Sequence, residues 1–159
     1  MWQSELFPRA SQKEVERVKF LLEHYIEMLG IIRDFEEHEG DLQQVSVDGE
    51  VGRRIDQDDL YADKTANAVF LHEKQQWVYQ QYCFYTSHLR RAVALLREED
   101  VRMSIEYRYF EGKSPKEVWL LFKRAMSPST IRRKQNEGAE GIADTLKLMG
   151  FFEKDTTKF

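Results

Sequence analysis

Residues 112–133 read GKSPKEVWLLFKRAMSPSTIRR, and this stretch decides the fold of the C-terminal part of the chain. Ser114 has the preferences of a helix N-cap, with Pro at the first helical position and Glu three residues beyond the cap. Ser127, again followed by Pro, opens a second segment of the same kind. Two short helices, each with its own start signal and separated by about four residues, are predicted. This is the arrangement of a helix-turn-helix.

The residues before this stretch predict one more helix of the same module. Acidic residues 98–100 suit a helix N-terminus, and apolar residues recur on one side as far as Phe110. Gly112 then suits the C-terminal cap of that helix. We therefore expect a compact C-terminal helix-turn-helix module over residues 98–159.

The N-terminal part predicts two long helices. Ser11 opens a capping box, and apolar residues three and four apart continue for about seven turns before the pattern fades at residues 36–40. Residues 40–58 hold three Gly and keep no period, so a loop is predicted there. A second helix is predicted from about 61 to 97. The expected fold is all-α, with a long antiparallel helical hairpin over residues 1–97 followed by the helix-turn-helix module.

The second helix of the module has the properties of a recognition helix. Its first two turns carry Ser129, Thr130 and Arg133, which can approach base edges in the major groove of DNA. Residues 112–150 hold eight Lys or Arg and four acids, a net charge of +4 in a chain of −4, so the rest carries −8. A solvated charged helix in an all-α bundle is the alternative interpretation. The local charge and the two Ser-Pro starts favour binding of double-stranded DNA.

A resemblance to a known family supports this interpretation. Residues 108–114, RYFEGKS, are similar to the segment that precedes the helix-turn-helix in region four of bacterial sigma factors. The longer layout resembles the ArpU/RinA-type phage transcriptional regulators, whose C-terminal module binds promoter DNA. The resemblance implies base contacts by Ser129, Thr130 and Arg133. It also implies contacts with the DNA backbone by four cationic residues, Lys116, Lys123, Arg132 and Lys134.

The chain departs from the family pattern in two places. The connection before Ser127 is one residue longer, with Ala125 where a small residue, often Gly, is common. Trp119 and Leu120 stand where small or charged residues are common. An exposed position for these two side chains would indicate a contact with another protein, such as RNA polymerase.

The long helices also predict self-association. Trp77, Tyr79, Tyr82, Phe84 and Tyr85 cover more than one side of their helix, whereas a hairpin buries one stripe. The aromatic residues are therefore either bundle core or the interface of a homo-oligomer, for which a dimer is the favoured form.

The sequence favours a binding protein over an enzyme. Its four His show no metal-ligand spacing, its single cysteine, Cys83, excludes a cysteine-rich zinc site, and no phosphate loop or catalytic set is present. We expect no cofactor, no metal and no membrane partner, and a cytoplasmic location in a bacterial host cell. A sequence-specific transcriptional regulator, phage or prophage encoded, is the predicted function. Two alternatives remain open: a phage packaging protein resembling a small terminase subunit, and an interaction protein that binds RNA polymerase or another regulator.

Overall fold

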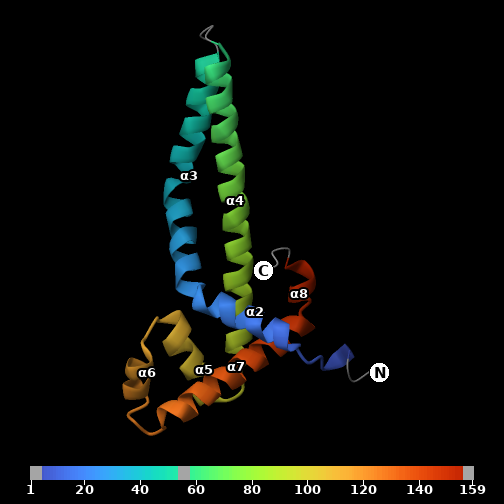
Figure 1. Cartoon of the computed structure of the whole chain (residues 1–159), viewed down its shortest axis with the longest axis vertical. Helices are drawn as coiled ribbons and strands as arrows, with labels where there is room; N and C mark the ends of the chain where they lie inside the picture. The colour runs from blue at the N-terminus through green and yellow to red at the C-terminus, as the bar shows by residue number, and fades with distance from the viewer. Residues whose placement is uncertain (1–4, 54–57, 156–159) are drawn as a thin grey trace. The chain divides into compact units, whose positions relative to one another are not determined.

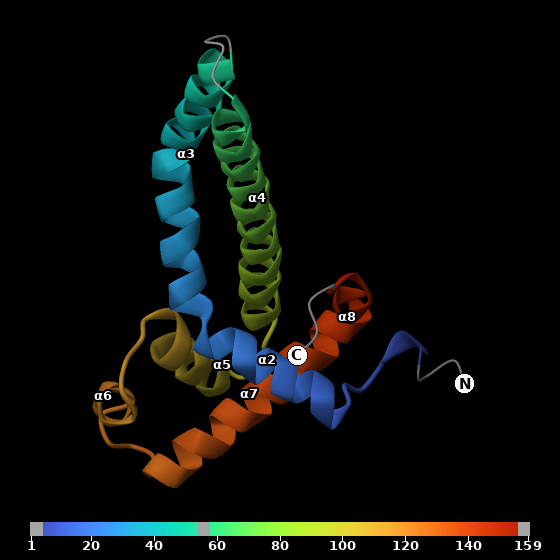
Figure 2. The same cartoon turned by 45° about the horizontal axis from the view of Figure 1, so that its top comes forward.

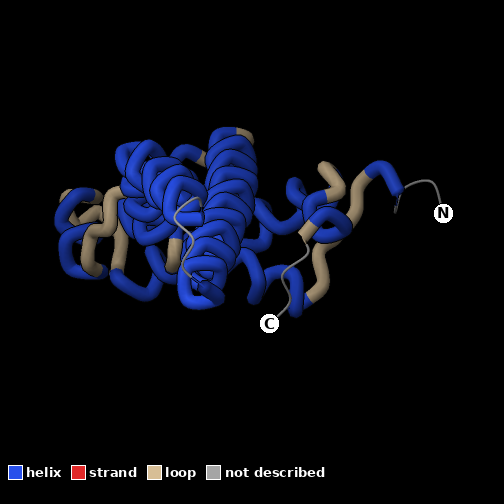
Figure 3. The backbone as a smooth tube through the Cα atoms, turned by 90° about the horizontal axis from the view of Figure 1, so that it is seen from above, coloured by secondary structure: helices blue, strands red, loops and turns tan. Residues whose placement is uncertain are grey.

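The structure of the chain, a computed structural model, describes the backbone of residues 5–53 and 58–155 and the side chains of residues 5–39, 66 and 68–155. The protein is 81% helical and holds no strand within the described residues (Figures 1 and 3), so the predicted all-α class is confirmed. The helices are α2 (Gln12–Glu23), α3 (Tyr25–Arg53), α4 (Asp58–Ala94), α5 (Glu99–Ile105), the π-helix η1 (Glu106–Phe110), α6 (Pro115–Leu121), α7 (Pro128–Leu148) and α8 (Phe151–Lys154).

The chain divides into two compact units, which we call the packed unit and the helical-pair unit. The packed unit contains residues 1–27 and 85–159, and the helical-pair unit contains residues 28–84. The predicted domain boundary at residue 97 stays a prediction; by their contacts, α2 and the last ten residues of α4 group with the C-terminal helices. Spacing within the sequence shows which residues of a helix share a face, but not which distant segment that face contacts.

The packed unit is built around α7. This helix packs against α5, α2, α6 and α8 (Figure 2). Its buried face carries Ile131, Ala139, Ile142, Ala143 and Leu146, spaced three, four and eight apart as an amphipathic helix requires. Other helices of the unit complete the core with fully buried side chains, namely Val18, Leu22, Leu89, Ile105, Val118 and Phe151.

A glycine allows the closest helix approach in this unit. Gly138 is buried on α7, and a Cβ added there would lie 2.7 Å from Cγ1 of Ile105 and 3.2 Å from Cγ1 of Val101. Ile105 is fully buried, so its side chain has little room to give way. The absence of a Cβ at position 138 therefore sets the distance between α7 and α5.

Polar contacts tie distant segments of the packed unit together. Arg17 forms a two-pronged ion pair with Asp155, at 2.8 Å from Nε and 3.1 Å from Nη2, and the Tyr85 hydroxyl donates to the same carboxylate at 2.7 Å. Lys147 on α7 donates to Glu14 on α2 at 2.9 Å. Partial burial works to raise the pKa of Glu14, but hydrogen bonds from the Ser11 amide and Lys147 outweigh it, and the net pKa is lowered.

The helical-pair unit consists of parts of α3 and α4 that lie side by side (Figures 1 and 2). The rings of Phe35 and Tyr79 stack with centroids 4.5 Å apart. The Tyr79 hydroxyl donates to Glu36 at 2.8 Å, and this hydrogen bond to a carboxylate raises the pKa of Tyr79 to about 12. The aromatic pair and its polar neighbour thus form one cross-link between the two helices.

Two features of the long helices differ from the sequence prediction. The first predicted helix is interrupted at His24, whose ring lies 4.6 Å from that of Phe20 and whose Nδ1 lies 2.6 Å from Glu27. An interruption of one residue leaves the three-and-four spacing of the apolar residues nearly unchanged, so the sequence pattern does not reveal it. The loop predicted at 40–58 is wrong over residues 40–53, where α3 continues, and residues 54–57 lie outside the described part. Glycines weaken a helix by about 1 kcal/mol each, but no Pro in this segment removes a backbone donor.

The helix predicted to end at Phe110 also has a finer structure. It is α-helical to Ile105 and then widens into η1, in which the Glu111 amide donates to Glu106 O at 2.9 Å. Gly112 follows with φ at +71°, as its predicted capping role requires. Arg108 closes this turn by donating to the carbonyl of Lys113 at 3.1 Å.

Candidate nucleic-acid interface

Both predicted helix starts are present around the candidate site. The Ser114 hydroxyl accepts from the Glu117 amide at 3.2 Å, and the Glu117 carboxylate accepts from the Ser114 amide at 3.4 Å, which completes the capping box of α6. The Ser127 hydroxyl accepts from the Thr130 amide at 3.2 Å and caps α7. Each serine is followed by Pro at the first helical position, which lacks the amide hydrogen that would otherwise go unpaired. The local sequence thus fixes where both helices begin.

The connection between α6 and α7 runs from Phe122 to Ser127 and is longer than the predicted four residues. Lys123 and Arg124 adopt left-handed backbone conformations, with φ of 55° and 59°. This region disfavours side chains with a Cβ by about 1–2 kcal/mol per residue. Backbone hydrogen bonds hold the turn, because the amides of Lys123 and Arg124 donate to the carbonyls of Leu120 and Trp119 at 2.9 and 3.1 Å.

Contacts between apolar side chains hold the first part of the turn on its buried side. Val118 on α6 and Ile131 on α7 are both buried, and the Phe122 ring meets Tyr107 of η1 edge to face at 5.6 Å. These contacts place α6 against α7 and η1. The polar residues at the start of α7 therefore project from a segment that is held by buried apolar contacts.

The residues predicted to contact bases lie together at the start of α7. Ser129 and Arg133 are exposed, and Thr130 is half-buried. The Thr130 hydroxyl lies 2.9 Å from the Ser127 hydroxyl. Arg133 Nη2 donates to the Thr130 hydroxyl at 3.5 Å. Thr130 thus orients Arg133 as well as offering its own hydroxyl. No acidic residue stands in the first turn of α7, so the positive end of this 21-residue helix is not neutralised there.

Three of the four residues predicted to contact the DNA backbone are free to meet a ligand. Lys116, Lys123 and Arg132 are exposed. Lys134 differs, since its side chain is 21% exposed and its Nζ lies 3.7 Å from a carboxylate oxygen of Glu98. The structure therefore separates Lys134 from the other three.

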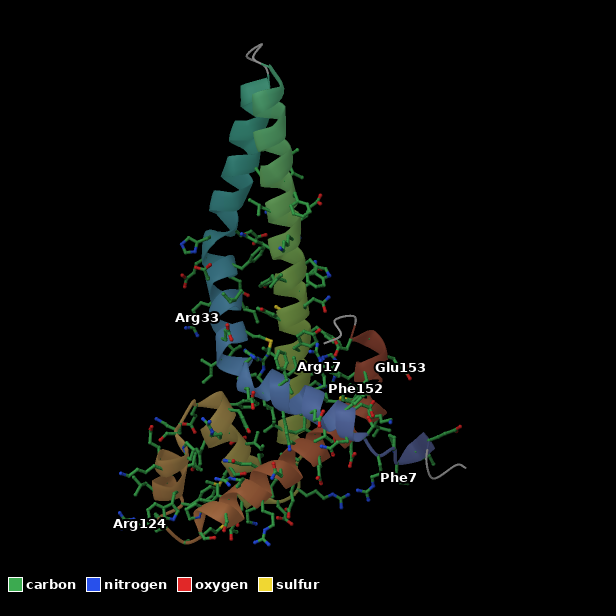
Figure 4. All side chains as sticks on the ribbon, viewed as in Figure 1. Phe7, Arg17, Arg33, Arg124, Phe152 and Glu153 are labelled. Atoms are coloured by element: carbon green, nitrogen blue, oxygen red, sulfur yellow. The ribbon has the colours of Figure 1, made fainter. Side chains whose placement is uncertain are left out.

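Arg124 is a further cation that the sequence prediction did not include. It is exposed in the turn (Figure 4). Its guanidinium lies 5.0 Å from the centroid of the Trp119 ring. Stacking on an aromatic face limits the mobility of an arginine and leaves its N–H groups available. The feature of the sequence that could have identified Arg124 is its position between the two Ser-Pro helix starts.

The charge on α7 reverses along the helix. Its exposed residues begin with Ser129, Arg132 and Arg133 and continue through Asn136 to Glu137 and Glu140. A polyanion is attracted to the first two turns and repelled at Glu137 and Glu140. The candidate surface thus has a definite end.

The described residues hold no group of three or more His, Cys, Asp or Glu placed to bind a metal ion. No helix among them is long and apolar enough to cross a membrane. No protein-family model, curated protein or solved structure matches the chain. What the site can bind is therefore inferred from its own side chains.

Proposed function

We propose that this chain is a sequence-specific transcriptional regulator that binds double-stranded DNA through α6 and α7, and not an enzyme. One observation carries the proposal: Ser129 and Arg133 are exposed at the start of a long helix that has no acid in its first turn and is flanked by exposed cations. The proposed setting is the cytoplasm of a bacterial host cell, and the second proposed partner is RNA polymerase.

In the proposed complex, α7 enters the major groove with its first two turns. Arg133 donates to O6 and N7 of a guanine, a contact that discriminates by about 1–3 kcal/mol per good pair. Ser129 and Thr130 contact neighbouring bases, while Lys116, Lys123, Arg124 and Arg132 meet phosphates. Lys134 reaches a phosphate only by leaving Glu98, so we expect a smaller contribution from it.

The test is a competition titration on duplexes selected from a random pool and on unselected duplexes. Arg133→Ala should cost about 1–3 kcal/mol on the selected site and little on random DNA. Arg132→Ala should weaken both similarly and reduce the slope of log K against log salt by about one. Lys154→Ala removes the same charge from the exposed part of α8 and should change neither value.

Two outcomes would count against the proposal. If the full chain selects no duplex at low salt, DNA binding is wrong. If Arg133→Ala weakens selected and random DNA equally, DNA binding survives but the assignment of the reading residues is wrong. Ser114→Ala, which removes the cap of α6 and not that of the helix with the reading residues, is a structural control that should lower stability by about 1 kcal/mol without changing sequence preference.

A second candidate function is supported by a specific surface. Leu120 and Leu121 of α6 are 44% and 43% exposed, beside the half-buried Trp119. Adjacent exposed leucines favour a contact with another protein. A chain that binds no duplex but binds purified RNA polymerase, with binding lost in Leu120→Ser, would favour an interaction protein.

A further inference from the structure

The helical-pair unit buries little of its own apolar surface. Among its described side chains, the buried hydrophobic residues are Met28 and Phe35. Five large hydrophobic side chains of the same unit are 40–62% exposed, namely Ile31, Val69, Phe70, Leu71 and Trp77. Large exposed apolar side chains gathered in one unit favour an interaction surface.

A groove of about 590 Å³ lies along this surface. Ile31 and Phe35 of α3 and Leu71 and Val78 of α4 provide its apolar lining, and Asp34 and Lys74 also line it. Its lining comes from both helices, so an occupant would contact the two together.

The aromatic residues of α4 extend the same surface. Phe70, Lys74 and Trp77 are spaced four and three apart, which places them on one face of the helix. Lys74 lines the groove, so Phe70 and Trp77, which are 62% and 47% exposed, flank it. Large exposed aromatic side chains are the residues that most often dominate the binding energy of an interface.

We propose that a second copy of this chain occupies the groove, so that two helical pairs form an intermolecular four-helix bundle. The charges favour this occupant, because a two-fold interface sets residue i against j and j against i. The lining holds one carboxylate, Asp34, one ammonium, Lys74, and the ring of His38, whose Nδ1 lies 3.2 Å from the Asp34 carboxylate on the same helix. Asp34 of each copy can face Lys74 of the other. A partner of single charge would meet one of these residues with like charge. The proposal does not depend on DNA binding.

The experiment uses charge reversal in the full chain, with molar mass measured by analytical ultracentrifugation from 1 to 200 μM. The wild type should dimerise. Asp34→Lys places two ammonium groups face to face, and Lys74→Glu places two carboxylates, so each variant alone should show at least a tenfold higher Kd. A mixture of the two should form a heterodimer, because both contacts then pair opposite charges.

One matched charge control and one apolar variant accompany the charge reversals. Arg33→Glu reverses a charge on α3 at an exposed residue that does not line the groove (Figure 4), and it should leave the Kd unchanged. Trp77→Ser should raise the Kd at least tenfold through loss of an apolar contact. Circular dichroism of each variant establishes that helix content is retained.

The results decide the proposal in both directions. Weakened single variants together with a restored mixture support it, whatever the behaviour of Trp77→Ser. A wild type that remains monomeric at 200 μM overturns it. A wild-type dimer that Asp34→Lys and Lys74→Glu leave unchanged also overturns it, because the interface would then lie on another surface.

Discussion

The packed unit and the helical-pair unit are both all-α but are stabilised in different ways. Of the buried hydrophobic residues in the described part, eighteen belong to the packed unit and two to the helical-pair unit. Around the 21-residue α7, the packed unit includes short helices, α5 and α6 having seven residues each. Isolated helices of that length are unstable in water, so they depend on the core that they form together.

In the helical-pair unit the helices are long, but few of the described side chains are buried. These helices satisfy their own backbone hydrogen bonds, but two helices in contact bury only one stripe of each. The comparison teaches that helix length and tertiary stability are separate properties. It also predicts that equivalent substitutions will have unequal effects in the two units.

The largest expected difference comes from matched leucines. Leu146→Ala removes a fully buried side chain of the packed unit and should cost about 2–5 kcal/mol of unfolding free energy. Leu71→Ala removes a side chain of the helical-pair unit that is 52% exposed. In dilute monomer it should cost no more than about 0.5 kcal/mol. Urea unfolding followed by circular dichroism measures both, and equal losses would refute the distinction between the units.

Replacing a glycine by alanine should give a stability difference of intermediate size. The substitution should destabilise the packed unit and stabilise the helical-pair unit. Gly138→Ala forces a Cβ to within 2.7 Å of Ile105 and should destabilise the packed unit by about 1–3 kcal/mol. Gly30→Ala on α3 has nothing within 4 Å of the new Cβ and should stabilise its helix by about 0.5–1 kcal/mol. Melting temperatures of the two variants are the measurement. A stabilising Gly138→Ala would show that α5 and α7 separate easily.

The smallest expected effect depends on pH and concerns the packed unit alone. Because the pKa of Glu14 is lowered from 4.5 in the folded state, its contribution is present above that value and is lost as the pH falls through the folded pKa. The partner, Lys147, is 37% exposed, so the contribution should stay below about 1 kcal/mol. Glu14→Gln should flatten this part of the curve of stability against pH. An unchanged curve would assign the acid sensitivity to other carboxylates.

Local chemistry was predictable from the sequence. The caps at Ser11, Ser114 and Ser127 and the positive φ of Gly112 follow from residue types at fixed spacing, and all four are present. These features depend on neighbours within four residues. The grouping of Ser129, Thr130 and Arg133 on one short segment was predictable for the same reason.

Features that depend on distant contacts were not predictable. The ion pair between Lys134 and Glu98 joins residues 36 positions apart, and no repeat of residue types along the sequence indicates such a contact. The left-handed turn at Lys123 and Arg124 contradicts the usual preference for Gly. It is held by the hydrogen bonds and packing that surround it. The grouping of α2 with α7 likewise required the three-dimensional structure.

The reversal of charge along α7 limits how much sequence one copy can read. From Ser129 to Asn136 the helix rises about 10 Å, at 1.5 Å per residue. That length spans about three base pairs of DNA at 3.4 Å each. A three-letter word recurs by chance about once in every 64 positions, too often to mark one site in a genome. Two copies acting together would read about six letters, which recur about once in 4,000 positions. On the proposed function, Glu137 and Glu140 in the middle of α7 would make selectivity a property of two chains acting together.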